Sequence, residues 1–195
     1  MFILTKIADL VQIAPADFGK LSHMAIEDNI NAKYANKVVQ KIGLFVCLWD
    51  ILWTSEGLIG HGDGLVNVNV EFRMVVFRPF KGEVLAARIT SQTRDGINLA
   101  TDFFHDIFVP WNELPDDTEF EASEGVWIWK VEGQVLYYDN NEMVHFEVMG
   151  EEWRDQAPTG PLDLSIDQAA SELLPPYKIT ASMKRAGLGC AIWWG

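Results

Sequence analysis

The sequence predicts a small α+β module followed by an all-β barrel of the OB type. Two observations carry this prediction: one long alternating strand that stops at Pro79, and a series of short strand-like segments after it. Apolar and polar side chains alternate along residues 66–74, and a period of two places them on opposite faces of a strand. Proline ends the strand because it has no N–H for the ladder. We therefore expect two modules, residues 1–80 and residues 81–195.

The first module is expected to place a helix on a sheet. Its expected elements are a strand at 2–13, a helix from an N-cap at Asp17 to about Tyr34, one or two buried strands at 38–53, a glycine-dense turn at 57–64 and the long strand at 65–78. The residues with helical spacing, which predict the packed face of the helix, are Phe18, Leu21, Ala25 and Ile26. Val75 and Phe77 interrupt the polar side of the long strand, so its last third is expected to be covered on both faces.

The second module is expected to consist of short antiparallel strands. The strands are predicted at 83–91, 97–101, 103–109, 126–138, 143–149 and 177–183. Asp95-Gly96 predicts a hairpin between the first two, and Asp139-Asn140-Asn141 predicts another between 126–138 and 143–149. An acidic loop at 113–124 and a long loop near 151–176, with a short helix at 165–174, complete the module. This number of short strands suits a small closed barrel.

Charge and cysteine content limit the possible functions. The net charge is −13, and residues 1–80 carry 7 Lys/Arg and 8 Asp/Glu whereas residues 81–195 carry 8 and 20. A second module this acidic argues against nonspecific adhesion to nucleic acid. Cys47 and Cys190 each lie in an apolar run, which predicts buried, reduced thiols in an intracellular protein. Since no signal peptide or membrane-length apolar segment is evident, we expect a soluble, unsecreted protein.

No pattern of catalytic or metal-binding residues is evident. The four histidines are scattered without an i, i+4 pair, and the two cysteines lack CxxC spacing. The glycine-dense turn lacks the Lys and Ser/Thr of a phosphate loop, and the serines lack the context of a nucleophile elbow. Acidic residues 116–124 are irregularly spaced, which favours a solvated loop over a cation site. We expect a protein without enzymatic activity, metal or cofactor.

Aromatic residues offer a binding alternative in the second module. Phe103, Phe104, Phe108 and Trp111 lie where an OB fold can present rings to unpaired bases, although the barrel core is the more ordinary place for each ring. The candidate RNA contacts are Arg88, Arg94, Phe104, His105 and Lys130. Trp127 and Trp129 share one side of a strand and predict a packed face. The terminal Trp193 and Trp194 are expected to dock on a neighbouring surface, because free indoles are costly in water.

Several stretches together resemble one known family. They are Ala35-Asn-Lys-Val-Val, Gly43-Leu-Phe-Val-Cys-Leu-Trp-Asp-Ile, Gly62-Asp-Gly, Phe72-Arg-Met-Val-Val-Phe-Arg-Pro-Phe, Gly82-Glu-Val-Leu, Asp106-Ile-Phe-Val-Pro, Pro158-Thr-Gly-Pro and Gly187-Leu-Gly with the terminal Trp pair. The chain resembles the stalk subunits of nuclear RNA polymerase III, whose relatives are the seventh subunit of RNA polymerase II and the E-prime component of archaeal RNA polymerase. Pro158-Thr-Gly-Pro and Trp193-Trp194 favour the polymerase III branch.

The resemblance implies a ribonucleoprotein-like tip domain followed by an S1-type OB domain, with no catalytic role. It implies a heterodimer with a helical stalk partner that docks on the polymerase core in the nucleus, contacts initiation factors and supports transcription of tRNA and 5S rRNA. The implied core-docking tip consists of Pro15, Asp17, Phe18, Gly19, Gly60, Gly62, Asp63 and Gly64. We place the partner helix, as a hypothesis, along residues 78–84. No membrane association is implied.

Two departures from RNA-binding relatives weaken the expected RNA contact. The strand around Asn98 lacks an aromatic residue that such domains often carry, and Pro110 stands where many carry His. Together with the acidic charge, this predicts weak, salt-sensitive RNA binding. Two alternatives to a polymerase subunit stay open: a free-standing OB-type factor for single-stranded RNA, and a hydrolase that uses the acidic residues.

Overall fold

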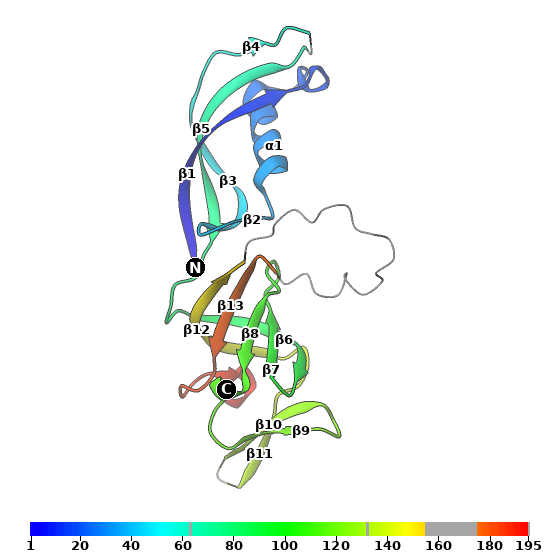
Figure 1. Cartoon of the computed structure of the whole chain (residues 1–195), viewed down its shortest axis with the longest axis vertical. Helices are drawn as coiled ribbons and strands as arrows, with labels where there is room; N and C mark the ends of the chain where they lie inside the picture. The colour runs from blue at the N-terminus through cyan, green and yellow to red at the C-terminus, as the bar shows by residue number, and fades with distance from the viewer. Residues whose placement is uncertain (63, 132, 155–174, 195) are drawn as a thin grey trace. The chain divides into compact units, whose positions relative to one another are not determined.

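A computed structural model describes residues 1–62, 64–131, 133–154 and 175–194. Contacts within the chain divide it into two compact units, Met1–Arg78 and Pro79–Gly195. We refer to them as the N-terminal unit and the C-terminal unit. Figure 1 labels α1 and most of the strands of both units.

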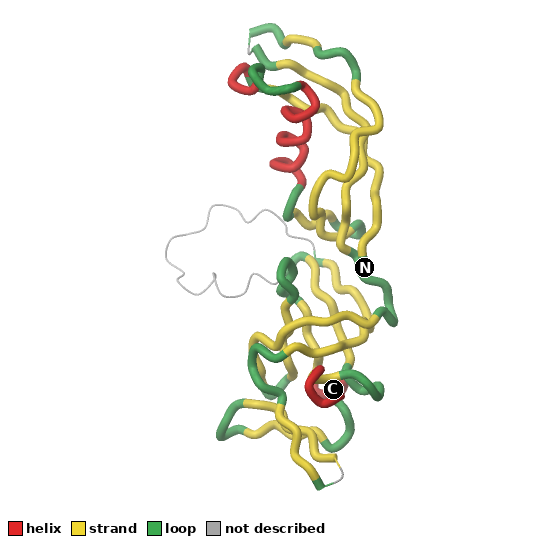
Figure 2. The backbone as a smooth tube through the Cα atoms, turned by 180° about the vertical axis from the view of Figure 1, so that it is seen from behind, coloured by secondary structure: helices red, strands yellow, loops and turns green. Residues whose placement is uncertain are grey.

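The N-terminal unit is an antiparallel sheet with one long helix on one of its faces. Its strands are β1 (Phe2–Ile13), β2 (Lys37–Val39), β3 (Gly43–Thr54), β4 (Leu58–Ile59) and β5 (Val66–Phe77). They run in the order β1-β5-β3-β2, and β4 pairs with the first residues of β5, before the part that pairs with β3. Figure 2 shows the helix α1 (Ser22–Tyr34) on a single side of this sheet. The predicted strands at 2–13 and 65–78 are therefore confirmed.

The alternation along β5 builds the core of this unit. Its buried side chains are Val68, Val70, Phe72, Met74 and Val76, and they pack against Ala25, Ile26 and Ile30 of α1. The intervening residues Asn69, Glu71 and Arg73 are at least partly exposed. Phe77 is fully buried and Val75 is half-buried, as expected for the last third of the strand.

The predicted start of the helix is wrong. Asp17 ends a short 3-10 helix, η1 (Pro15–Asp17), and α1 begins at Ser22 without a side-chain cap. Phe18 and Leu21 lie in the connection and are exposed, so only Ala25 and Ile26 of the expected helix face are buried. Gly19 explains the interruption, since glycine is costly inside a helix and leaves the chain free to turn before α1.

The apolar run 38–53 forms two strands, β2 and β3, but the second half of β3 is not buried. The pairing of β3 with β5 shifts register three times, between Phe45 and Cys47, Leu48 and Asp50, and Ile51 and Trp53. Each shift interrupts the regular pairing, as a β-bulge does when it bends and twists a strand. Trp49, Leu52 and Trp53 are exposed, and Cys47 is exposed as well, so the predicted burial of that thiol is wrong.

The C-terminal unit is a closed barrel, which confirms the predicted order of an α+β module and an all-β module. Its sheet contains β6 (Val84–Thr93), β7 (Gly96–Ala100), β8 (Ile107–Pro110), β12 (Met143–Trp153), β13 (Tyr177–Ser182) and β14 (Gly189–Cys190). Strand β13 pairs in parallel with β8 and antiparallel with β12, which closes the sheet on itself. The interior is filled by side chains such as Ile89, Leu99, Val109 and Phe146.

Residues 113–138 differ most from the prediction. They contain a separate three-stranded sheet of order β11-β10-β9, made of β9 (Thr118–Glu121), β10 (Val126–Val131) and β11 (Gln134–Tyr137). The expected hairpin between 126–138 and 143–149 is wrong, because Gly133, with a φ of +79°, lies in a turn that pairs β11 with β10. The acidic loop carries β9 instead of being irregular throughout. The helix predicted at 165–174 lies outside the described residues.

The end of the chain packs against both sheets of the C-terminal unit. It forms a 3-10 helix, η4 (Ala191–Trp194), and the Trp193 ring lies 4.7 Å from the Tyr138 ring and 5.5 Å from the Trp129 ring. Trp194 Nε1 donates a hydrogen bond of 3.1 Å to the Leu188 carbonyl, but its side chain is half-exposed. The predicted docking is thus confirmed fully for Trp193 and in part for Trp194.

Candidate docking tip and barrel face

The two predicted tip loops lie side by side at one end of the N-terminal unit. A Cβ atom on Gly64 would lie 3.8 Å from Cγ of Pro15, so the loop before β5 contacts η1. Gly62 and Gly64 have φ angles of +98° and +68°, which only glycine adopts readily. The Gly60 N–H closes this loop with a hydrogen bond of 2.8 Å to the Leu65 carbonyl. Asp63 lies outside the described residues.

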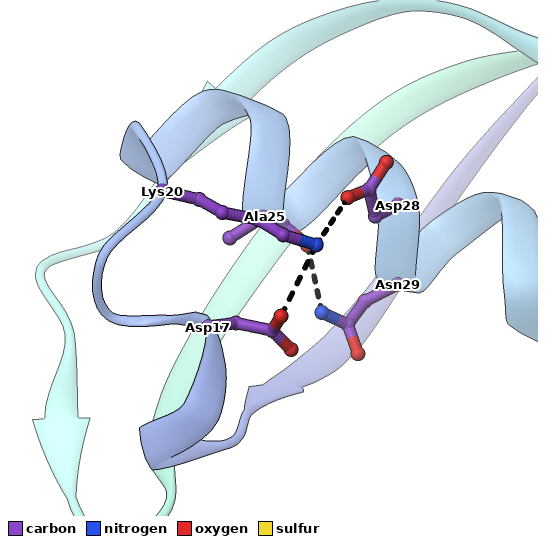
Figure 3. A network of polar contacts seen from close by, with 5 residues as sticks. All are labelled: Asp17, Lys20, Ala25, Asp28 and Asn29. Atoms are coloured by element: carbon purple, nitrogen blue, oxygen red, sulfur yellow. Dashed lines mark hydrogen bonds and ion pairs between the residues drawn. The ribbon is translucent and has the colours of Figure 1, made fainter.

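A lysine holds the connection between η1 and α1. Lys20 Nζ lies 2.7 Å from Asp28 Oδ2 and 3.1 Å from Asp17 Oδ1, and Figure 3 shows the ammonium group between the two carboxylates. The hydrogen bonds to Asp28 and then to Asp17 raise the pKa of Lys20 above its ordinary value. In the same figure Asn29 Nδ2 donates to the Ala25 carbonyl, 2.7 Å away, inside α1. Phe18 and Gly19 are therefore presented on a loop that is tied at both ends.

Exposed apolar side chains surround these loops. Leu58 and Ile59 of β4 are 71% and 70% exposed, and Phe18, Leu21 and Met24 are also at least half-exposed. The sequence interpretation missed Leu58 and Ile59, although two adjacent aliphatic residues inside a glycine-dense turn were a usable signal. Exposed apolar side chains on neighbouring surface segments are a feature of protein interaction sites.

A depression of 180 Å³ opens next to the start of α1. It is lined by Ile13, Asp17, Phe18, Lys20, Ser22, Ala25 and Val66. Two predicted tip residues, Asp17 and Phe18, therefore contribute to one concave surface together with the ends of β1 and β5.

The predicted RNA contacts lie on different elements of the C-terminal unit. Arg88 lies on β6 and donates to the Asn141 carbonyl, Arg94 lies in the turn after β6, and Lys130 of β10 pairs with Glu119 at 2.5 Å. Phe104 is 4% exposed and packs on Tyr177, with ring centroids 5.4 Å apart. Burial removes the Phe104 ring from the surface that RNA can reach.

His105 lines a depression on the barrel, which none of the other predicted contacts lines. This depression has a volume of 310 Å³ and is lined by Asn98, His105, Asp106, Ile107, Phe108, Pro175 and Lys178. Lys178 Nζ lies 4.4 Å from the centre of the Phe108 ring, within the range of a cation–π contact. Burial raises the pKa of Asp106, while His105 and Lys178 act in the opposite direction. Asn98 and Lys178 were missed because their strands are far apart in the sequence.

A metal site finds no support among the described residues, and the buried thiol of Cys190 is not activated for chemistry. Nowhere in this part of the chain do three His, Cys, Asp or Glu side chains gather as a metal ion would require. Burial raises the pKa of the Cys190 thiol, which disfavours the reactive thiolate. Among the described residues, no helix has both the length and the apolar character needed to cross a bilayer.

Family models match both units. Residues 8–64 match the SHS2 domain found in the N terminus of Rpb7p/Rpc25p/MJ0397, and residues 83–194 match RNA polymerase III subunit Rpc25. An SHS2 domain followed by a strand-rich, OB-like barrel defines the class of stalk-type polymerase subunits, which are not the catalytic ones.

Several similar proteins span the whole chain, and others span part of it. DNA-directed RNA polymerase III subunit rpc8 of Schizosaccharomyces pombe is 39% identical over 100% of both chains, and subunit RPC8 of Bos taurus is 35% identical over 100% of this chain and 98% of its own. DNA-directed RNA polymerase II subunit 7 of Arabidopsis thaliana is 32% identical but covers 64% of this chain and 70% of its own. The chain belongs to the RNA polymerase III subunit Rpc25 family.

Proposed function

We propose that this chain bridges the core of nuclear RNA polymerase III and a helical stalk partner, and thereby supports initiation at genes for small untranslated RNAs such as tRNA. The observation that carries the proposal is the number of exposed apolar side chains near the two glycine-bearing loops, namely Phe18, Leu21, Leu58 and Ile59. Family membership supports the same reading. In this proposal residues 1–80 dock on the polymerase core, and residues 81–195 form a docking surface for other macromolecules.

Affinity purification of the endogenous protein followed by mass spectrometry tests this proposal. The wild-type chain should recover polymerase III subunits and one mostly helical partner from nuclear extract. A Leu58→Ser/Ile59→Ser variant should keep the partner but recover less of the core, because both side chains are exposed and their loss leaves the fold intact. Recovery of the wild-type chain as a monomer without polymerase subunits would contradict the proposal.

We propose that the partner helix packs along residues 78–84. Phe80 is 64% exposed and Val84 is 41% exposed, so two apolar side chains are available in a short segment. Backbone hydrogen bonds hold this segment: the Gly82 N–H donates to the Val148 carbonyl at 2.7 Å, and the Glu83 N–H donates to the Phe80 carbonyl at 3.1 Å. A Phe80→Ser/Val84→Ser variant should weaken the heterodimer in a titration with the purified partner. Unchanged heterodimer affinity would count against this placement.

Contact with emerging RNA is proposed to be weak and to use the barrel depression. Asn98, His105, Phe108 and Lys178 supply an amide, two groups that can carry positive charge and one ring. The acidic charge of the rest of the unit opposes binding at long range. Tight binding of single-stranded RNA by the isolated chain would instead support a free-standing RNA-binding factor.

A further inference from the structure

The depression beside α1 has the lining of a site for an apolar side chain. Ile13 and Ala25 are buried and form its inner part with Val66, while the Phe18 ring is 51% exposed. A ring that is half in solvent next to a concave apolar surface gains burial when another side chain fills the space.

The charged residues of the depression are already paired with each other. Asp17 and Lys20 are 3.1 Å apart, and Lys20 also binds Asp28 outside the lining. The two charges in the lining compensate each other, and the remaining polar group is the Ser22 hydroxyl. An ionised occupant would lose its hydration and would have to compete with the Asp17–Lys20 pair, whereas an uncharged apolar group loses nothing of this kind.

The size of the depression fits a single side chain. A buried apolar cavity of about 150 Å³ is large enough to hold benzene, and this depression measures 180 Å³. Leu21 and Met24, which are adjacent in sequence to lining residues, are also exposed apolar residues.

We propose that this depression receives one aliphatic side chain, the size of leucine, isoleucine or methionine, from a loop of a polymerase core subunit. The inference rests on the proposed docking of the tip and names the part of that surface where the partner is anchored. Phe18 closes over the inserted side chain, and the pair of Lys20 with Asp17 keeps the loop that carries Phe18 in place.

A substitution in this chain that fills the depression with its own side chain tests the proposal. Ser22 is exposed and lines the depression, so Ser22→Leu places an aliphatic group inside it, and Ser22→Ala is the matched control that removes the same hydroxyl without filling. The full-length chain, bound to its stalk partner, is titrated against polymerase core that lacks this subunit. Ser22→Leu should bind about tenfold more weakly or worse, while Ser22→Ala stays within about twofold of wild type.

A second pair of variants guards against misfolding of Ser22→Leu. Phe18→Ala removes the wall of the depression, and Leu21→Ala removes an exposed apolar residue that lies outside the lining. Phe18→Ala should weaken core binding clearly more than Leu21→Ala, with unchanged melting temperatures for both.

Each remaining outcome has a definite meaning. Wild-type affinity of Ser22→Leu, or equal effects of Phe18→Ala and Leu21→Ala, overturns the anchor site and leaves the docking function standing. A wild-type chain that does not bind the core contradicts the docking function and this inference together. Loss of a self-associated dimer in Ser22→Leu, with core binding intact, would assign the depression to a second copy of the chain and overturn the proposal.

Discussion

The backbone N–H of Trp127 donates a hydrogen bond of 2.8 Å to the side-chain oxygen of Gln92, although the two residues are 35 positions apart. The Gln92 amide nitrogen donates to the Tyr138 carbonyl at 2.5 Å, and the Tyr138 N–H donates to the Trp127 carbonyl at 3.0 Å. The side chain of Gln92 thus satisfies two backbone groups at the end of the β10–β11 hairpin and ties that hairpin to β6. Trp127 Nε1 adds a second tie to the Thr93 carbonyl at 2.9 Å.

Replacing Gln92 by leucine should destabilise the C-terminal unit. The Trp127 N–H and the Tyr138 carbonyl would both lose their partner in a partly buried place, which costs roughly 1–3 kcal/mol. Urea unfolding followed by tryptophan fluorescence measures the change. Gln12→Leu is the matched control, because Gln12 makes one exposed hydrogen bond to Asn67 and its loss should change stability by less than about 0.5 kcal/mol. Equal stabilities of the two variants would contradict the role of Gln92.

Replacing Gly189 by alanine should loosen the packing of Trp193. An added Cβ would lie 2.7 Å from Cζ3 of Trp193, and the φ of Gly189 is +96°. Gly187→Ala is the control, since Gly187 has a φ of +86° with no atom within 4 Å of the added Cβ. Both variants carry the backbone cost of order 1 kcal/mol, and Gly189→Ala should lose roughly 1–3 kcal/mol more from overpacking. A higher melting temperature for Gly187→Ala than for Gly189→Ala would support this prediction. Identical melting temperatures would contradict it.

The stability of the N-terminal unit should fall at high pH through Tyr34. Burial, followed by a hydrogen bond of 2.7 Å to Asp9, raises the pKa of Tyr34 from 10.0 to about 12. A pKa that is higher in the folded state gives stability that is present below 10 and is lost as the pH rises toward 12. Tyr34→Phe has no proton to lose and should abolish this part of the alkaline decline, which unfolding curves at several pH values can show. Parallel pH curves for both proteins would exclude Tyr34 as the cause.

Asp9, the hydrogen-bond partner of Tyr34, predicts that the stability of the N-terminal unit also falls at low pH. Burial acts to raise the pKa of Asp9, but hydrogen bonds from Lys33 and Tyr34 outweigh it and lower the pKa below 3.8. A lowered folded-state pKa gives stability that is present above 3.8 and is lost as the pH falls through the folded-state value. Asp9→Asn should therefore be less stable at neutral pH and lose less stability on acidification. If the stability of Asp9→Asn fell as steeply with decreasing pH as that of wild type, this prediction would be contradicted.

RNA binding by the barrel should depend on salt through Lys178. If Lys178 neutralises one phosphate, Lys178→Met lowers the slope of log K against log salt by about 0.7 for a single strand. Lys184→Met is the control, because Lys184 is exposed and does not line the depression. Fluorescence anisotropy of a labelled single-stranded RNA over a range of salt concentrations measures both slopes. Equal slopes for the two variants would place the RNA elsewhere.

Local patterns predicted the long elements of the fold well. The alternation of Val68, Val70 and Phe72 with polar residues foretold both the strand and its buried face, because side-chain direction along a strand has a fixed period of two. Asp95-Gly96 foretold the turn between β6 and β7, because Asp-Gly suits a hairpin turn. Strands and tight turns of this kind can be predicted because they depend on residues that are close together in the sequence.

Sequence patterns did not predict the structure where the same residues could form either of two local structures. Residues 126–138 could be read as one strand, and the pairing of β11 with β10 rather than with β12 depends on which partner strands are nearby. The helix start shifted from Asp17 to Ser22, and the Asp17 carboxylate pairs with Lys20 instead of capping α1. The burial of Phe104 depends on Tyr177, which is distant in the sequence.

The sequence by itself determined the class of this protein: an α+β module with a long alternating strand, a Pro79 that ends it, and a barrel of short strands, together with the motifs that mark its family. Tertiary structure alone decided which side chains meet, namely Gln92 with Trp127, Phe108 with Lys178, and Phe18 with Ile13 and Val66 around the tip depression. The physical reason is range. Periodicity and turn chemistry act between neighbours in the chain, whereas a binding surface is built from contacts whose partners only the folded backbone brings within a few ångströms of one another.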